Sequence, residues 1–84
     1  MYNILPLTPK LLTKVIKYNL SKKFAKSVLL LSQNPFHPGL HTELLEPKQS
    51  GLHSFRLDIK FRGIFLFHSD TTTIQVVGIT VHYH

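Results

Sequence analysis

The chain has 84 residues, enough for one hydrophobic core but not for two, so we expect a single domain over residues 1–84. With 43% hydrophobic residues and no cysteine, the composition excludes a disordered chain, a disulfide scaffold, a thiolate metal site and a cysteine nucleophile. No apolar run approaches the length of a transmembrane helix and no secretion signal precedes the first helix, which predicts a cytoplasmic protein with no membrane partner.

The net charge of +6 is concentrated in the first third of the chain. Residues 1–35 contain six lysines and no acidic residue, whereas basic and acidic side chains cancel over residues 36–84. A one-sided basic surface suits a polyanion such as nucleic acid. Because a basic surface can also serve solubility alone, the charge leaves both interpretations open.

The first predicted elements are a short strand at residues 2–5 and a helix that begins at Thr8 and Pro9. A threonine followed by proline is typical of an N-cap and a first helical position. Four apolar residues then recur at helical spacing and are expected to face the core: Leu11, Leu12, Val15 and Ile16. We expect this helix to end at Asn19 or Leu20.

A second helix is expected to follow, with Ser21 as its cap and Asn34-Pro35 as its stop. Its apolar stripe consists of Phe24, Val28 and Leu31, with Ala25 beside it. The lysines of the two helices fall on the opposite faces: Lys10, Lys14, Lys17, Lys22, Lys23 and Lys26. The prediction is therefore a helical hairpin with an apolar inside and a lysine-covered outside.

Residues 34–51 form a long connection with three prolines and two glycines, in which residues 41–45 are expected to be extended. From Leu52 the apolar period becomes two, which predicts strands. The side chains expected on the buried face are Phe55, Leu57, Ile59 and Phe61, with a turn near residues 58–60.

A more fully buried strand is predicted at residues 64–67 and a turn at residues 69–73. The last strand, residues 74–81, is apolar on both faces and is expected to be central, with Gly78 marking a bulge. The resulting fold class is α+β, in the order β-α-α-β-β-β, with the N-terminal helical hairpin packed on a mainly antiparallel sheet.

Six histidines raise the question of a metal site. His37 and His41 are four residues apart, but in a loop, and His82 and His84 alternate at the end of a strand. Without cysteines and with few acidic residues nearby, these histidines are better explained as surface and site residues than as ligands. We expect neither a metal ion nor a cofactor.

The polar residues left after the core is assigned include Glu43 in the long loop, Arg62 on the polar face of the sheet, and His82 and Tyr83 at its end. Cleavage of RNA by internal attack needs a base for the ribose 2′-OH, a cation for the phosphate and an acid for the departing 5′-oxygen. A glutamate, an arginine and a histidine can supply these groups without a metal. Composition alone does not single them out, because most domains contain such residues.

The motifs Asn34-Pro35-Phe36, residues 51–57 with Ser-Phe-Arg, residues 61–65, and His82-Tyr83 occur in the order found in a known family. On these residues the chain resembles the RelE/ParE superfamily, the toxins of bacterial type II toxin–antitoxin pairs. The similarity is strongest to the RelE/YoeB-like ribosome-dependent mRNA interferases. In YoeB-like toxins a glutamate precedes the strand arginine by nineteen residues, as Glu43 precedes Arg62, and those toxins also end in His-Tyr, which His82-Tyr83 matches.

The resemblance implies the β-α-α-β-β-β fold and a role for each site residue. Glu43 is the general base, Arg62 the phosphate-stabilising cation, His82 the general acid, and Tyr83 positions or stacks on a base. It further implies that Arg56 and Lys60 help to hold mRNA, and that the helical lysines face ribosomal RNA: Lys14, Lys17, Lys22, Lys23 and Lys26. The implied partners are a cognate antitoxin protein, the ribosome and mRNA.

Each of these roles has a structural alternative. Glu43 can be a solvated loop carboxylate, Arg62 can pair with Asp58 across the turn, His82 can be a frayed terminal residue, and Tyr83 can cover the sheet edge. Two further aromatic residues are expected to be structural, His53 in packing and Phe36 as a core anchor of the loop. For the whole protein, the alternatives are a ParE-like toxin that inhibits DNA gyrase without catalysis and a basic nucleic-acid-binding module.

Overall fold

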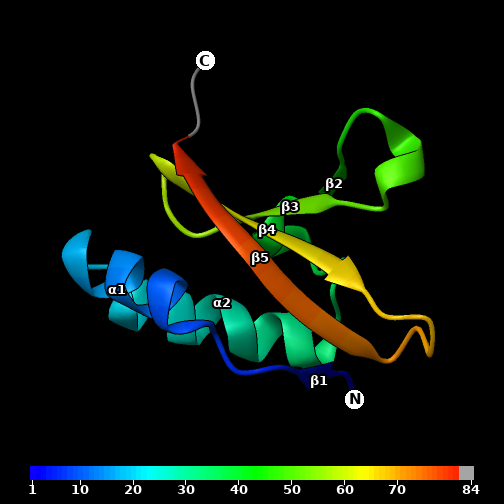
Figure 1. The fold of residues 1–84 in the computed structure, drawn as a ribbon, viewed down its shortest axis with the longest axis horizontal. Coiled ribbons are helices and arrows are strands. Elements are labelled where there is room, and N and C mark those ends of the chain that lie inside the picture. Colours follow the sequence, from blue (N-terminus) through cyan, green and yellow to red (C-terminus); the bar gives the residue numbers. More distant parts are fainter. Residues whose placement is uncertain (82–84) are drawn as a thin grey trace.

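The computed structural model describes residues 1–81, which form two helices packed on a five-stranded sheet (Figure 1). In chain order the helices and strands are β1 (Asn3–Ile4), α1 (Pro9–Lys17), α2 (Ser21–Gln33), β2 (Glu43–Leu44), β3 (His53–Arg56), β4 (Phe61–Phe67) and β5 (Thr73–Val81). Short 3₁₀ helices, η1 (Pro38–Leu40) and η2 (Lys48–Ser50), flank β2. The predicted α+β class and helical hairpin are confirmed, and the extended piece expected at residues 41–45 is an additional strand, β2.

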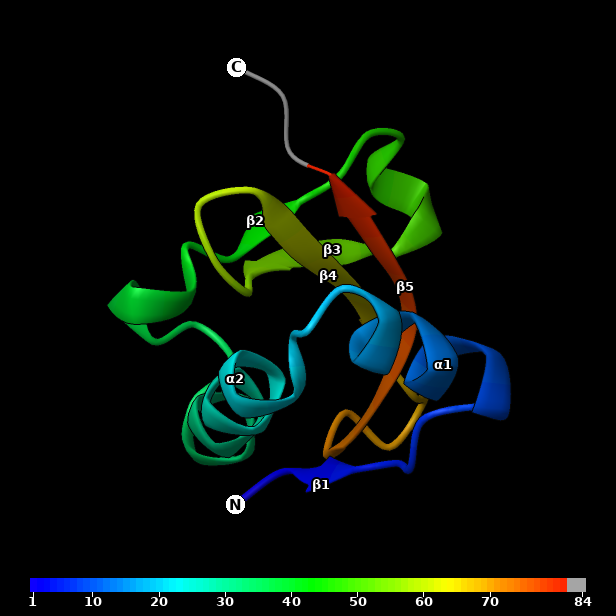
Figure 2. The same cartoon turned by 90° about the vertical axis from the view of Figure 1, so that its left-hand side faces the viewer.

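The sheet has the order β1-β5-β4-β3-β2 and is antiparallel except for the parallel pair of β1 and β5. Both helices lie on the same side of the sheet, as two views at right angles show (Figures 1 and 2). One face of the sheet is therefore covered by the hairpin and the other is open. Within residues 1–81 neither helix is long and apolar enough to cross a membrane.

Helix α1 begins as predicted, because the Thr8 hydroxyl oxygen accepts a hydrogen bond of 3.3 Å from the Leu11 amide. Leu11 and Val15 are buried. The expectation that Leu12 and Ile16 also face the core is wrong, since they are 49% and 64% exposed. A helix of nine residues packed along one sheet edge buries a single i, i+4 stripe, and the neighbouring stripe, about 100° around the helix, faces outward.

Helix α2 starts at Ser21, but its N-cap position is Leu20 and no side chain caps it. The prediction of Ser21 as the cap is thus wrong by one residue. The turn between the helices is instead set by Asn19, whose φ of 55° lies in the left-handed region, and by burial of Leu20 in the core. The helix ends at Asn34, as predicted.

The stripe predicted for α2 is only partly buried. Leu31 is buried, Phe24 and Val28 are half-buried, and Ala25 is exposed. The other buried position is Ser27, whose hydroxyl donates a 3.0 Å hydrogen bond to the Arg56 carbonyl. This bond ties α2 to the end of β3, where the carbonyl would otherwise lack a partner in the ladder.

Strands β3 and β4 form a hairpin whose turn lies at residues 57–60, as predicted. One Asp58 carboxylate oxygen accepts the backbone N–H groups of Lys60 at 2.8 Å and Phe61 at 2.7 Å. Ile59 lies at the tip of this turn and is 76% exposed, so the prediction that it is buried is wrong. The strand alternation that suggested its burial stops at Arg56, where β3 ends.

Strand β4 is the central strand. The prediction that β5 is central holds only for Thr73 and Ile74, which pair with β1; beyond them the outer edge of β5 has no strand partner among residues 1–81. The predicted bulge is confirmed, because Ile64 pairs with Gly78 and Phe65 pairs with Val76, which leaves Val77 as the extra residue.

Candidate active site on the open face of the sheet

Three polar residues form one row across the open face. Arg56 on β3 is the direct partner of Arg62 on β4, and Arg62 is the direct partner of Thr80 on β5. Their sequence neighbours Phe55, Phe61 and Ile79 are buried on the opposite face, so the row faces away from the helices. Alternation along the strands thus places both arginines on the side of the sheet that the hairpin leaves open.

A hollow of about 270 Å³ lies on this face and brings Glu43 and Arg62 together. Ser54, Ile64 and Thr80 are among the residues that line it. Glu43 reaches it because β2 pairs with β3 in the register Glu43 to Ser54, and Ser54 in turn pairs with Ile64. Adjacent strands are about 4.8 Å apart and Arg62 lies two residues, about 7 Å, along β4 from Ile64, so the backbones of Glu43 and Arg62 are separated by roughly 12 Å, a gap that their side chains can narrow to the span of a phosphodiester group.

Arg62 is half-buried, and part of its guanidinium makes no hydrogen bond within residues 1–81. One of its terminal nitrogens, Nη1, donates to the His41 carbonyl at 3.4 Å. Its Nε is buried and has no hydrogen-bond partner among residues 1–81. A buried guanidinium N–H without an acceptor is costly.

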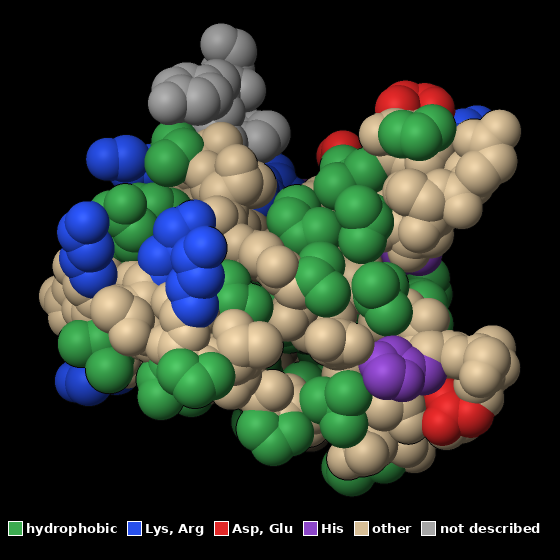
Figure 3. Space-filling model, viewed as in Figure 1, with side chains coloured by type: hydrophobic (Ala, Val, Ile, Leu, Met, Phe, Trp, Pro, Cys, Tyr) green, Lys and Arg blue, Asp and Glu red, His purple; other side chains and the backbone are tan. Residues whose placement is uncertain are grey.

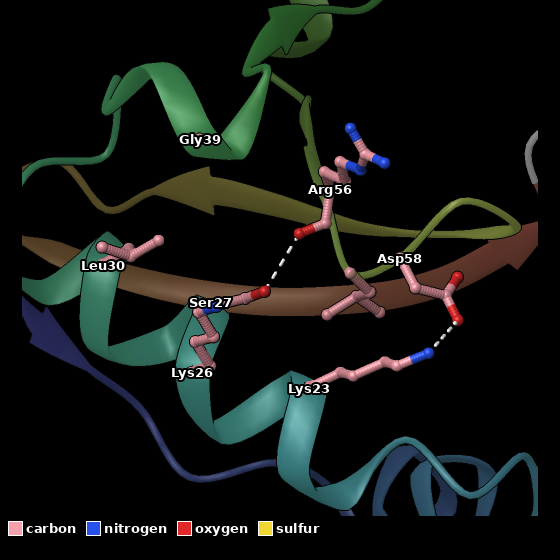
Figure 4. Close-up of a pocket in the computed structure, with 8 residues that line it drawn as sticks. Lys23, Lys26, Ser27, Leu30, Gly39, Arg56 and Asp58 are labelled. Atoms are coloured by element: carbon pink, nitrogen blue, oxygen red, sulfur yellow. Dashed lines mark hydrogen bonds and ion pairs between the residues drawn. The ribbon is translucent and has the colours of Figure 1, made fainter.

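Within residues 1–81, Arg62 does not pair with Asp58, which was the structural alternative for this arginine. Asp58 forms an ion pair with Lys23 at 3.1 Å instead (Figure 4). Burial alone would raise the pKa of Asp58, but hydrogen bonds from the Phe61 amide, Lys23 and the Lys60 amide outweigh it and hold that pKa below its usual value. The carboxylate that could have neutralised Arg62 is therefore held on the covered side of the sheet.

Two of the predicted site residues, His82 and Tyr83, lie outside the described residues. Strand β5 is described to Val81, which pairs with Phe61 at the end of the sheet nearest Arg62. The predicted roles of His82 and Tyr83 stay predictions.

The lysines of the helical hairpin do not form a uniform outer face. Lysine and arginine side chains gather at the end of the molecule formed by α1 (Figure 3). Lys14, however, donates to the Ile79 carbonyl of β5 at 3.2 Å, and Lys23 pairs with Asp58, so the expectation that both simply point away from the fold is wrong. The side chains of Lys22 and Lys26 are exposed and make no hydrogen bond or ion pair within residues 1–81.

A second hollow, of about 290 Å³, lies between α2 and the β3–β4 turn. Lys23, Lys26, Ser27 and Asp58 are among its lining residues (Figure 4). Arg56 contributes its backbone carbonyl there, while its guanidinium points away from α2. The side chain of Arg56 is thus directed to the open face, although its backbone anchors the covered one.

The two aromatic residues predicted to be structural differ in outcome. His53 stacks on Phe65 with ring centroids 5.2 Å apart, and its Nδ1 lies 3.0 Å from the Gly51 carbonyl, which fits a packing role. Phe36 is 57% exposed and stacks on Phe67, so the prediction of a core position is wrong.

Residues 1–81 contain no group of three or more histidine, aspartate or glutamate side chains placed to hold a metal ion.

Sequence reasoning missed the part that His41 plays at this site. His41 was weighed only as a metal ligand, yet its carbonyl contacts Arg62 and its ring contacts Arg56. No local pattern could have revealed these contacts, because they join residues 15 and 21 positions apart.

Residues 1–81 thus combine two helices on one face of a mixed five-stranded sheet with a hollow on the other face that Glu43 and Arg62 line. A solved structure with the same fold is the YoeB/ParE toxin from Agrobacterium tumefaciens, which superposes with a TM-score of 0.73 over 99% of this chain and 100% of that chain. The two sequences are 15% identical, so this likeness establishes the fold alone. No protein-family model matches the sequence, and no curated protein does.

Proposed function

We propose that the chain is the toxin of a type II toxin–antitoxin pair and acts as a ribosome-dependent mRNA endoribonuclease. The observation that carries the proposal is the hollow that Glu43 and Arg62 share on the open face. Among the described residues no carboxylate neutralises Arg62, and its Nε lacks an acceptor. The fold shared with a YoeB/ParE toxin supports the toxin class.

In the proposed reaction Glu43 takes the proton from the ribose 2′-OH, and the 2′-oxygen attacks the adjacent phosphorus. A bond forms between the 2′-oxygen and phosphorus while the bond to the 5′-oxygen breaks, which leaves a 2′,3′-cyclic phosphate and a 5′-hydroxyl. His82 gives a proton to the departing 5′-oxygen and Tyr83 positions a base. Charge builds up on the non-bridging phosphate oxygens, where a guanidinium is most effective.

Arg62 is suited to this role because its guanidinium is always charged and presents its donors in a planar fork. The fork matches two oxygens of one phosphate. Arg56 lies directly opposite Arg62 and, with Lys60, would help to hold the mRNA.

The lysines of the two helices are proposed to bind RNA and to take no part in the cleavage reaction. The proposed partner of the helical surface is ribosomal RNA, through Lys14, Lys17, Lys22, Lys23 and Lys26. The cognate antitoxin should be acidic, because the surface it must neutralise carries six lysines and no acid over residues 1–35. A ribosome-dependent toxin acts in the cytoplasm.

The decisive experiment compares wild type with Arg62→Ala and Arg62→Lys on ribosomes that carry a reporter mRNA, with cleavage mapped by primer extension. Arg62→Ala should lose a factor of about 100 or more in cleavage rate, as loss of a charge-stabilising donor does. Arg62→Lys keeps the charge but not the fork and should fall in between. Lys48→Ala in η2 removes a cation away from the hollow and should cleave like wild type.

A wild-type protein that arrests growth and binds ribosomes without cleaving mRNA would contradict the nuclease assignment. Inhibition of DNA supercoiling by gyrase under the same conditions would favour the ParE-like alternative. Binding to nucleic acid without mRNA cleavage or gyrase inhibition would favour the third interpretation, a basic nucleic-acid-binding module. Growth that continues at high expression of the protein alone would contradict the toxin assignment itself.

A further inference from the structure

His41 has a backbone conformation that non-glycine residues seldom adopt. It follows η1 with φ of 48° and ψ of 47°, in the left-handed region. The conformation is fixed on both sides, because the His41 amide donates to the Pro38 carbonyl at 3.3 Å and the Thr42 hydroxyl donates to the Pro35 carbonyl at 2.6 Å. Strained backbone of this kind persists where the surrounding structure over-determines it, often at functional sites.

This conformation directs two acceptors of one residue to the two arginines of the candidate site. The His41 carbonyl accepts from Arg62 Nη1 at 3.4 Å, and His41 Nε2 lies 3.4 Å from Arg56 Nη1. Both contacts are at the long end of the hydrogen-bond range, so a stronger acceptor such as a phosphate can replace them. Within residues 1–81, these two contacts are the only hydrogen bonds that link the side chain and the carbonyl of His41 to strands β3 and β4.

An acceptor between the two arginines offsets the repulsion between their charges. Arg56 and Arg62 are direct cross-strand partners, and like charges in this position repel. No carboxylate forms an ion pair with either in the described part of the chain. Both guanidiniums can only donate, so the nitrogen that faces Arg56 must be an acceptor, which requires a neutral ring with its proton on Nδ1.

We propose that His41 is a positioning residue that holds Arg56 and Arg62 side by side for one phosphodiester, and that it does so only while its ring is neutral. The inference rests on the proposed function for the identity of the ligand. The charged groups that face His41 are Arg56 from β3 and Arg62 from β4, and Glu43 follows two residues later on β2. Protonation would turn the acceptor into a donor and add a third positive charge, so Arg56 would lose its place.

The test uses the full chain and dimethyl phosphate as the probe, with binding followed through the arginine Nε–H resonances by NMR. His41→Gln carries its Oε1 near the position of the ring Nε2, so it keeps an acceptor for Arg56 and has no ring to protonate. His41→Gly tolerates the left-handed conformation and keeps the carbonyl, but it has no side chain. Both variants should remain folded, which circular dichroism checks.

At pH 7.5 we expect His41→Gln to bind like wild type and His41→Gly to bind several-fold more weakly, with the Arg56 resonance displaced and that of Arg62 little changed. At a pH low enough to protonate the ring, which the His41 resonances themselves report, wild type should resemble the glycine variant while His41→Gln is unchanged. An Arg56 resonance that is the same in wild type and His41→Gly would overturn the proposal. Equal losses in both variants, or equal pH dependence of wild type and His41→Gln, would overturn it as well.

These measurements involve no ribosome and no cleavage. A protein that binds the probe as expected but does not cut mRNA would contradict the proposed function and leave the role of His41 intact. A protein that cuts mRNA with an unperturbed Arg56 in His41→Gly would do the reverse.

Discussion

Substitution of Gly63 by alanine tests how the centre of the sheet is built. Gly63 lies on the central strand β4, opposite Phe55 of β3, and the Phe55 ring occupies the space where a side chain at position 63 would be. A Cβ atom added there would overlap the Cε1 and Cζ atoms of that ring. Phe55 is fully buried, so its ring cannot move aside into solvent.

The expected cost of Gly63→Ala follows from this overlap. Overpacking a well-packed core costs about 1–3 kcal/mol, and the value should be near the upper end because the clashing group is an aromatic ring held by two strands. A domain of this size has a total free energy of unfolding of about 4–13 kcal/mol. A loss of about 3 kcal/mol would lower the melting temperature by roughly 12–24 °C.

The sheet contains a matched control in Gly78 on β5. A Cβ atom there would meet Ile64 at 3.7 Å, an ordinary van der Waals contact, and the backbone is not in the left-handed region. Because glycine within a strand is unfavourable by roughly 0.5–1 kcal/mol relative to alanine, Gly78→Ala should be neutral or slightly stabilising.

Urea and thermal unfolding, followed by far-ultraviolet circular dichroism, measure both variants. Replacing Phe55 by leucine in the Gly63→Ala background should recover part of the loss, and a double-mutant cycle isolates the coupling between the two positions. If Gly63→Ala and Gly78→Ala melt within a few degrees of each other, the aromatic ring does not fill the space above Gly63 and the reasoning fails.

Three further outcomes are expected. Thr8→Ala, which removes the N-cap of α1, should lower the free energy of unfolding by about 1 kcal/mol, as chemical denaturation can measure. Because the pKa of Asp58 is lowered in the folded state, its contribution to stability is present above about pH 4 and is lost as the pH falls through the folded-state pKa. Asp58→Asn should therefore be less stable than wild type at pH 7 and should lose this deficit as acid protonates the wild-type carboxylate; a deficit that does not change with pH would contradict this. Replacing Lys22 and Lys26 by glutamine should reduce the slope of log affinity for ribosomes against log salt by about 2 without changing cleavage in saturated complexes, whereas replacing Lys23, which is paired internally, should have a smaller effect on the slope.

The amino-acid sequence by itself determined the order and type of nearly all the elements. Thr8 and Pro9 predict the start of α1, Asn34 predicts the end of α2, and Asp58 predicts the β3–β4 turn. Each of these signals acts within about four residues, through a cap, a backbone restriction or a side chain that bonds its own turn. Such signals can be interpreted without knowing what lies across the sheet.

Only the tertiary structure decided which faces are covered. Leu12 and Ile16 match the helical period as well as Leu11 and Val15 do, yet only the second pair is buried, because α1 meets the sheet along one stripe. Periodicity reveals that a helix has an apolar side but not how wide the surface opposite that side is.

The candidate site also depends on contacts between distant segments. Arg62 was predicted on the open face from the strand period alone, and its place there is confirmed by burial of its neighbours. That Glu43 lies beside it follows from the register of β2 on β3, and that His41 contacts both arginines follows from the left-handed turn after η1. Strand register and loop conformation are set by packing across the whole domain, so no short stretch of sequence encodes them.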